Sequence, residues 1–188
     1  ILESGDVARI GAINPDIKLI FMIRNPIERA WSAVRFHLYK GAIINLESAD
    51  EVISLLQHPA MSLRGDYERT IETYLTTFDS SQILVCFYDA IKNNPVGLMS
   101  DITKFLAIEP YGETVITNKV PVNPSPAHTI PQKVSNFLYE TYAPMINRMA
   151  ESFGSYSTIW NSEGSPGDVK SKKNQVIDMS ICKPTIIL

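Results

Sequence analysis

The chain has 188 residues, enough for one domain at the usual size of about 100 to 200 residues. Hydrophobic residues make up 45% and charged residues 20%, which excludes a disordered, collagen-like or coiled-coil protein. Seventeen Lys and Arg against twenty Asp and Glu give a net charge of -3, which argues against nucleic-acid binding but leaves room for a local cationic pocket.

The cysteines and apolar runs indicate the compartment. Cys86 and Cys182 are too few for a disulfide framework, so a reducing environment, and hence a cytoplasmic location, is expected. The longest apolar run, Leu19 to Ile23, is far shorter than the about 20 residues that span a bilayer. Because the lead from Ile1 carries no structural start signal, we expect an N-terminal truncation.

The first predicted elements are a helix and a strand. Asp6 is a candidate cap for a helix through Ile13, which must end before Pro15. Residues 17–23 are apolar except for Lys18, a pattern typical of a strand buried on both faces. We therefore predict an interior parallel strand there.

A helix is predicted from Pro26 to about Tyr39, since proline suits the first helical turn. Farther on, Ser48 to Glu51 is a capping box that opens a helix through Leu56. Residues 58–64 are expected to form a loop, and Gly65-Asp66-Tyr67 introduces the next helix.

Strand and helix alternate again in the second half. Residues 82–88 predict a second buried strand, and Asn94-Pro95 opens a helix through Leu106. Residues 109–131 contain five prolines and predict a long irregular connection. A final helix starts at Pro131, and Pro144 should kink or split it. The alternation predicts an α/β fold with a parallel sheet flanked by helices, in a domain over residues 1–161 followed by a flexible tail over 162–188.

The segment from Arg24 to Ser32 combines three features that favour an anion. Arg24 follows a strand and offers a planar fork of donors. The helix that begins at Pro26 adds partial positive charge at its N-terminus. Ser32 carries a hydroxyl off the apolar stripe of that helix. Ligands of parallel sheets bind beyond the carboxyl ends of the strands, which is where Arg24 is predicted to lie.

This segment, Arg24-Asn25-Pro26 followed by Arg29-Ala30 and Ser32, resembles the 3'-phosphate-binding motif of sulfotransferases that use 3'-phosphoadenylyl sulfate, especially the bacterial and heparan-sulfate types. The resemblance covers residues 9–160 and implies a three-layer, P-loop-type fold. It also implies that Arg24 and Ser32 contact the 3'-phosphate of the donor, whose product is adenosine 3',5'-bisphosphate, without a metal.

Relatives of that family carry, upstream, a Lys-Thr-Gly-Thr-Thr-like loop that holds the 5'-phosphosulfate, together with the catalytic base, and this sequence contains no such loop. By resemblance, the chain is the C-terminal portion of an enzyme that transfers a sulfuryl group to a hydroxyl or amine of a small-molecule or carbohydrate acceptor. Two alternatives are a non-catalytic nucleotide-binding or interaction module and a P-loop kinase-like enzyme. No catalytic residue is assigned.

Each candidate residue also has a purely structural interpretation. Arg24 could pair with Glu28 or Asp89, Ser32 could be an ordinary surface serine, and Arg29 is better explained by a salt bridge than by a ligand. Tyr67 has helical spacing that favours core packing over a role in the acceptor site, and Cys86 should be inert in a buried strand. No spacing indicates a metal site, and three histidines are weak candidates for a base: His37, His58 and His128.

Overall fold

The computed structural model describes residues 2–42, 44–109, 128–154, 156–162 and 182–184, and the chain divides into two compact units. The sheet unit comprises Ile1–Arg24, Tyr67–Val120 and Met179–Leu188. The helical unit comprises Asn25–Asp66 and Pro121–Asp178.

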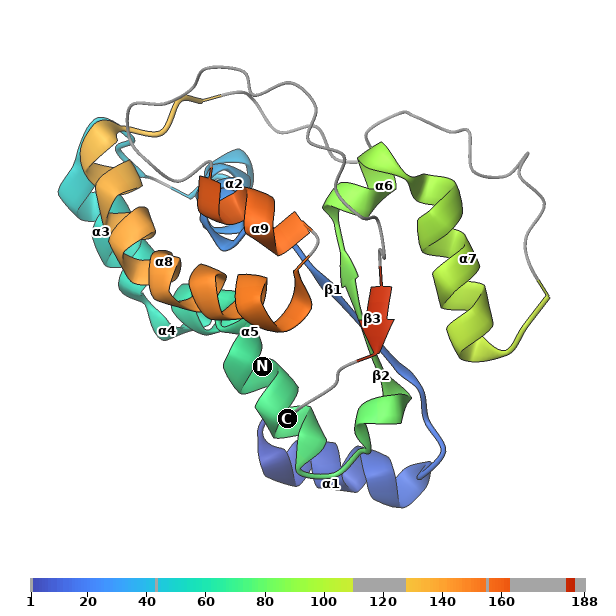
Figure 1. Cartoon of the computed structure of the whole chain (residues 1–188). Helices are drawn as coiled ribbons and strands as arrows, with labels where there is room; N and C mark the ends of the chain where they lie inside the picture. The colour runs from blue at the N-terminus through green and yellow to red at the C-terminus, as the bar shows by residue number, and fades with distance from the viewer. Residues whose placement is uncertain (1, 43, 110–127, 155, 163–181, 185–188) are drawn as a thin grey trace. The chain divides into compact units, whose positions relative to one another are not determined.

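The sheet unit is built around two parallel strands (Figure 1). β1 (Leu19–Ile23) pairs with β2 (Ile83–Phe87) in a register that sets Ile23 beside Phe87. β3 (Cys182–Pro184), which the sequence did not predict, pairs antiparallel with β2. Because β1 and β2 run in the same direction, the residues that follow them lie together, beyond the carboxyl ends of the two strands.

Helices lie on both sides of this sheet. α1 (Ser4–Ile13) packs against α5 (Tyr67–Leu75), while α7 (Pro95–Leu106) packs against β2 and β3. Figure 1 shows α5 and α7 on opposite sides of β1 and β2, so the unit has three layers. Two short elements complete it: η2 (Ser80–Gln82) precedes β2, and α6 (Asp89–Asn93) follows it.

The two parallel strands differ in burial. All five residues of β2 are buried, as the sequence predicted. The expectation of a strand buried on both faces is wrong for β1 in the part of the chain that the structure describes, because Ile20 and Met22 are 40% and 37% exposed. Among the described elements, β1 is at the edge of the sheet, and α7 packs on β2 and β3 instead of covering it.

The helical unit is organised around one long helix. α8 (Gln132–Phe153) packs against α2 (Pro26–Tyr39), α3 (Ala49–Gln57) and α9 (Tyr156–Ser162). Between α3 and α5 the chain forms α4 (Pro59–Ser62) and the 3-10 turn η1 (Leu63–Gly65). The largest buried side chains of this unit include Val34, Val52, Leu138, Ile146 and Trp160.

Most helix boundaries agree with those predicted from the sequence. Three details of the prediction are wrong. Asp6 is not the cap of α1 but its third residue, where its carboxylate accepts from the N–H of the capping residue Glu3. Residues 58–64 form α4 and part of η1 rather than a loop, since the His58 ring caps the turn by accepting from the Ala60 N–H. α8 continues through Pro144 without splitting, because Met145, Ile146 and Met149 are buried against the rest of the unit.

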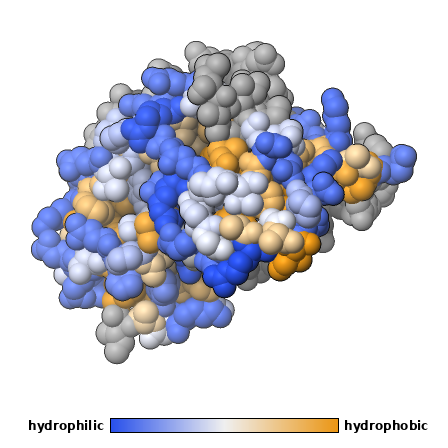
Figure 2. Space-filling model, turned by 90° about the horizontal axis from the view of Figure 1, so that it is seen from below, coloured by the Kyte–Doolittle hydropathy of each residue, from blue (hydrophilic) through white to orange (hydrophobic). Residues whose placement is uncertain are grey.

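The helix-rich chain, with its small sheet built on two parallel strands, confirms the predicted α/β class. Most of the predicted irregular connection and of the predicted tail lies outside the described residues. On the face shown in Figure 2, hydrophobic residues occur in separate areas between hydrophilic ones. Such mixing is ordinary for a folded protein surface.

Candidate functional site

Arg24 directly follows β1, and two tyrosines bind the main-chain carbonyls of Arg24 and of the preceding Ile23. The Tyr67 hydroxyl donates a hydrogen bond of 2.8 Å to the Arg24 carbonyl oxygen. The Tyr88 N–H donates one of 2.7 Å to the carbonyl oxygen of Ile23. The residue at the end of β1 is thus fixed from α5 and from the end of β2, at the sheet edge where ligands of parallel sheets bind.

The side chain of Arg24 lies over the ring of Tyr88. The guanidinium carbon is 5.1 Å from the ring centroid, within the range of a cation–π interaction. Arg24 is half-buried and Tyr88 is 48% exposed, so a cation is held at the surface of the sheet unit rather than in its core. A guanidinium is a planar group whose N–H donors match the oxygens of a phosphate.

Tyr67 is a structural residue in this arrangement. It is 3% exposed, and its ring packs edge-on against Phe21 with centroids 5.9 Å apart and planes at 80°. The sequence favoured core packing for Tyr67, and the structure confirms it. The sequence did not indicate that the same hydroxyl would anchor the carbonyl of Arg24.

The N-terminus of α2 begins with the next residue in the chain. Asn25 is 6% exposed, and its side-chain oxygen caps the helix by accepting from the Ile27 N–H at 3.0 Å. The main-chain carbonyl of Asn25 accepts from the main-chain N–H of Arg29. Pro26 occupies the first helical position, as predicted. A capped helix start of this kind carries partial positive charge.

Ser32 lies on α2, half-buried, in the helical unit, whereas Arg24 belongs to the sheet unit. The division between the units falls between Arg24 and Asn25. The structure therefore describes each residue within its own unit, and their shared contact with one phosphate group stays a prediction.

Two other side chains of α2 form structural contacts inside the helical unit. Arg29 donates a hydrogen bond of 3.1 Å to the carbonyl oxygen of Met61. The Trp31 ring nitrogen donates one of 2.9 Å to the carbonyl oxygen of His128. A structural role for Arg29 was predicted, but with a carboxylate partner. The partner that the structure provides is a main-chain carbonyl, which ties α2 to α4.

The three histidines have ordinary structural surroundings. His37 lies on α2 with its ring edge-on to Phe36, and His58 caps α4. His128 is exposed and contributes its carbonyl to Trp31. Nothing in these contacts marks any of them as a general base.

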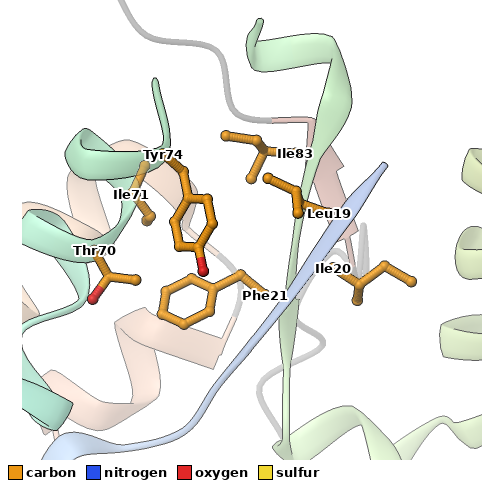
Figure 3. Close-up of a pocket in the computed structure, with 7 residues that line it drawn as sticks. All are labelled: Leu19, Ile20, Phe21, Thr70, Ile71, Tyr74 and Ile83. Atoms are coloured by element: carbon orange, nitrogen blue, oxygen red, sulfur yellow. The ribbon is translucent and has the colours of Figure 1, made fainter. Parts of the chain in front are cut away.

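One cavity in the sheet unit lies between β1 and α5. It has a volume of about 110 Å³, and Figure 3 shows Phe21 of β1 and Tyr74 of α5 pointing toward one another across it, with Ile20 on the other side of the strand. Its remaining lining residues are Leu19, Thr70, Ile71 and Ile83. Without a charged residue in its lining, this cavity is suited to apolar packing and not to a phosphate.

A second cavity, of about 280 Å³, lies in the helical unit between α3, α4 and α8. It too has no charged lining residue, and neither Arg24 nor Ser32 lines either cavity. Its lining comprises Leu56, Gln57, Ser62, Phe137, Leu138, Thr141 and Tyr142.

Within the described ranges, no group of three or more His, Cys, Asp and Glu side chains is placed to hold a metal ion. Of the helices in this part of the chain, none combines the length and the apolar character that crossing a membrane requires.

Tyr88 is the site residue that sequence reasoning missed. It was predicted only as the last residue of a strand. A signal was present, because Tyr88 follows the second apolar run as Arg24 follows the first. If the two runs pair in parallel, both residues come to the same sheet edge.

Comparison with known proteins identifies relatives. Human bifunctional heparan sulfate N-deacetylase/N-sulfotransferase 2 is 30% identical over 120 residues, which cover 58% of this chain and 14% of that protein. The mouse protein of the same name is 31% identical over the same length and shares. This chain thus spans about one seventh of the curated relatives that it matches.

A solved structure shares the fold. The sulfotransferase from Alicyclobacillus acidocaldarius superimposes with a TM-score of 0.59 at 21% identity, covering 84% of this chain and 62% of that one. The model of the family described as the sulfotransferase domain matches residues 6–154, which include both predicted ligands, Arg24 and Ser32. This chain therefore belongs to the sulfotransferase domain family, a family of group-transfer enzymes.

Proposed function

We propose that this chain supplies the 3'-phosphate-binding part of a sulfotransferase whose donor is 3'-phosphoadenylyl sulfate, with Arg24 and Ser32 as the ligands. The observation that carries the proposal is the position of Arg24, directly after a parallel strand and directly before the capped N-terminus of α2. A fork of guanidinium donors and a helix start at one point in the chain favour a bound phosphate.

The reaction that this donor supports is sulfuryl transfer. A bond forms between the acceptor oxygen or nitrogen and sulfur, while the bond from sulfur to the bridging phosphate oxygen breaks and the acceptor loses its proton. The leaving group is adenosine 3',5'-bisphosphate, which keeps the 3'-phosphate. Arg24 and Ser32 would hold this phosphate, at the end of the donor that does not react, and so act by positioning the donor.

For the acceptor, we propose a hydroxyl or an amine on a carbohydrate or another small molecule. The curated relatives are named for N-sulfotransfer to heparan sulfate, which is a carbohydrate acceptor. No described residue is given the role of the base that takes the acceptor proton.

The experiment is a calorimetric titration of the chain with adenosine 3',5'-bisphosphate and with 5'-AMP. Arg24→Ala should weaken binding of the bisphosphate about tenfold to hundredfold, the range for loss of a hydrogen bond to a charged group. Ser32→Ala should weaken it about two- to tenfold, because a neutral hydroxyl contributes less. Binding of 5'-AMP should change little in either variant.

Matched substitutions control for general effects. Arg9 is an exposed arginine of the sheet unit that pairs with Asp6, and Ser54 is an exposed serine of α3. Arg9→Ala and Ser54→Ala should leave bisphosphate binding unchanged. Equal losses for the bisphosphate and 5'-AMP in Arg24→Ala would overturn the assignment of Arg24 to the 3'-phosphate.

The same titration addresses the two other interpretations. A kinase-like enzyme would prefer ATP to the bisphosphate, and the sulfotransferase family match already weighs against it. A non-catalytic interaction module would bind neither nucleotide although circular dichroism shows the chain to be folded. A non-catalytic nucleotide-binding module would bind the bisphosphate and would differ from the enzyme only in the absence of sulfuryl transfer.

A further inference from the structure

We propose that the larger of the two cavities binds a neutral ring compound that carries a hydroxyl group, and that the Tyr142 hydroxyl recognises this group. The cavity lies between α3, α4 and α8, all of which belong to the helical unit. Neither Arg24 nor Ser32 lines it, so the site is separate from the proposed phosphate ligands and goes beyond the proposed function.

The cavity is large enough for one six-membered ring. An engineered protein cavity of about 150 Å³ with apolar walls binds benzene. The cavity of the helical unit has a volume of about 280 Å³, which leaves room for a ring with a small substituent. Leu56 and Leu138 are buried, whereas Gln57 and Thr141 are exposed. The cavity therefore reaches from the surface into the core of the unit, and a ligand can enter it from solvent.

The walls of the cavity favour a neutral ligand. Three of the lining side chains are apolar, those of Leu56, Phe137 and Leu138. The others are polar and uncharged. An ionised ligand would lose its hydration here without gaining a partner of opposite charge. A ligand with an apolar ring and one uncharged polar group matches both kinds of wall.

Tyr142 is the residue that marks the cavity as a binding site. Its side chain lines the cavity and is 8% exposed. Within the described part of the chain, no group forms a hydrogen bond with its hydroxyl. A buried tyrosine hydroxyl usually has a partner, because an unpaired polar group in the interior is unfavourable. A ligand that supplies the missing partner therefore gains a hydrogen bond that the described residues do not make.

The Tyr142 hydroxyl lies next to the junction of α4 and η1. Its oxygen is 2.6 Å from the position of a Cβ atom added to Gly65. Ser62, three residues before Gly65, lines the cavity, and among the described residues its hydroxyl has no hydrogen-bond partner either. The Thr141 hydroxyl, in contrast, donates to the Phe137 carbonyl oxygen at 2.7 Å. Tyr142 and Ser62 thus offer two hydroxyls, each able to donate or to accept, to a hydroxyl of the ligand.

The test uses benzyl alcohol and toluene, which differ only by one hydroxyl group, in NMR titrations of the full chain. Toluene leaves water more readily, so each probe is compared between variants and not with the other probe. Tyr142→Phe should weaken binding of benzyl alcohol about two- to tenfold, the range for one hydrogen bond, and leave toluene binding unchanged. Benzoate, the charged analogue, should not bind measurably.

Three control variants define where the probes bind. Tyr39 is an exposed tyrosine at the end of α2, and Tyr39→Phe should leave binding of both probes unchanged. Thr141→Phe places a bulky ring at the exposed side of the cavity and should abolish binding of both. Arg24→Ala should leave benzyl alcohol binding unchanged, so this site and the proposed donor site succeed or fail separately.

Several results would refute the proposal. A folded chain that binds neither probe has no such site, and binding that survives Thr141→Phe lies elsewhere. If Tyr142→Phe weakens toluene as much as benzyl alcohol, the Tyr142 hydroxyl does not recognise the ligand hydroxyl.

Urea denaturation without a ligand gives an independent readout. Tyr142→Phe should leave the denaturation midpoint unchanged or raise it, because the hydroxyl has no described partner to lose. A lower midpoint would show that the hydroxyl is already paired within the protein, which would contradict its availability to a ligand.

Discussion

At the scale of single residues, Gly65 shows how closely the helical unit is packed. It is buried in η1, and a Cβ atom added to it would lie 2.6 Å from the hydroxyl oxygen of Tyr142 on α8. Two ring carbons of Tyr142 would lie within 3.0 Å of the same atom. Tyr142 is 8% exposed, so its ring must shift within the packed unit to admit the added atom.

Gly65→Ala should therefore lower the free energy of unfolding by about 1–3 kcal/mol, the usual cost of overpacking. Gly5 is the matched control, because it lies in α1 with no atom within 4 Å of the added Cβ position. Gly5→Ala should raise stability by about 0.5–1 kcal/mol, as alanine is the better helix former. Urea denaturation measures both, and a Gly65→Ala variant as stable as the parent would contradict the packing described.

The candidate site shows what sequence can predict for individual residues. Arg24 and Ser32 stood out because their spacing forms a motif, and their phosphate contacts remain predictions. The stacking of Tyr88 on Arg24 could not be predicted from a local motif, because it depends on which strands pair and in what register. The role of Tyr67 depends on a contact between residues 43 positions apart in the chain.

At the scale of elements, the asparagine that precedes α2 links stability to the proposed site. Asn25 accepts from the Ile27 N–H at 3.0 Å, and Asn94 caps α7 in a similar way by accepting from the Gly97 N–H at 3.0 Å. Both helices have proline at the first position. The two caps are thus a matched pair, of which only one adjoins Arg24 in the chain.

Asn25→Ala and Asn94→Ala should each lower the free energy of unfolding by about 0.5–2 kcal/mol, the usual value of an N-terminal cap. Only Asn25→Ala should also weaken binding of adenosine 3',5'-bisphosphate, because it loosens the helix start that follows Arg24. Chemical denaturation and calorimetry on the two variants measure these effects. A loss of binding of the same size in Asn94→Ala would show that helix stability in general, and not the α2 start, supports the ligand.

Elements were predictable where a local signal marked both ends. α2 and α7 begin at Asn-Pro pairs, and their bounds follow from capping and apolar spacing. α4 was missed because its four residues are too few to show a period, and its cap is a histidine ring. The continuity of α8 through Pro144 was missed because burial of the residues beyond the proline outweighs the local cost.

At the scale of the whole molecule, the α/β class and the burial of β2 were predictable from alternating helices and apolar runs, and the partial exposure of β1 was not. A run of apolar residues predicts burial on both faces only if a layer covers each face. Ile20 and Met22 are partly exposed because the described helix α7 packs over β2 and β3. β3 could not be predicted, because Cys182–Pro184 lacks the length and alternation that mark a strand.

The central claim, that the residues around Arg24 bind the 3'-phosphate of the donor, is tested most directly by phosphorus NMR. Adenosine 3',5'-bisphosphate has two phosphorus resonances, and they report separately on its two ends. Addition of the chain should shift the 3'-phosphate resonance more than the 5'-phosphate resonance. Arg24→Ala should abolish the 3' shift, while Arg9→Ala should keep it. A 3' resonance that moves equally with the parent chain and with Arg24→Ala would contradict the account.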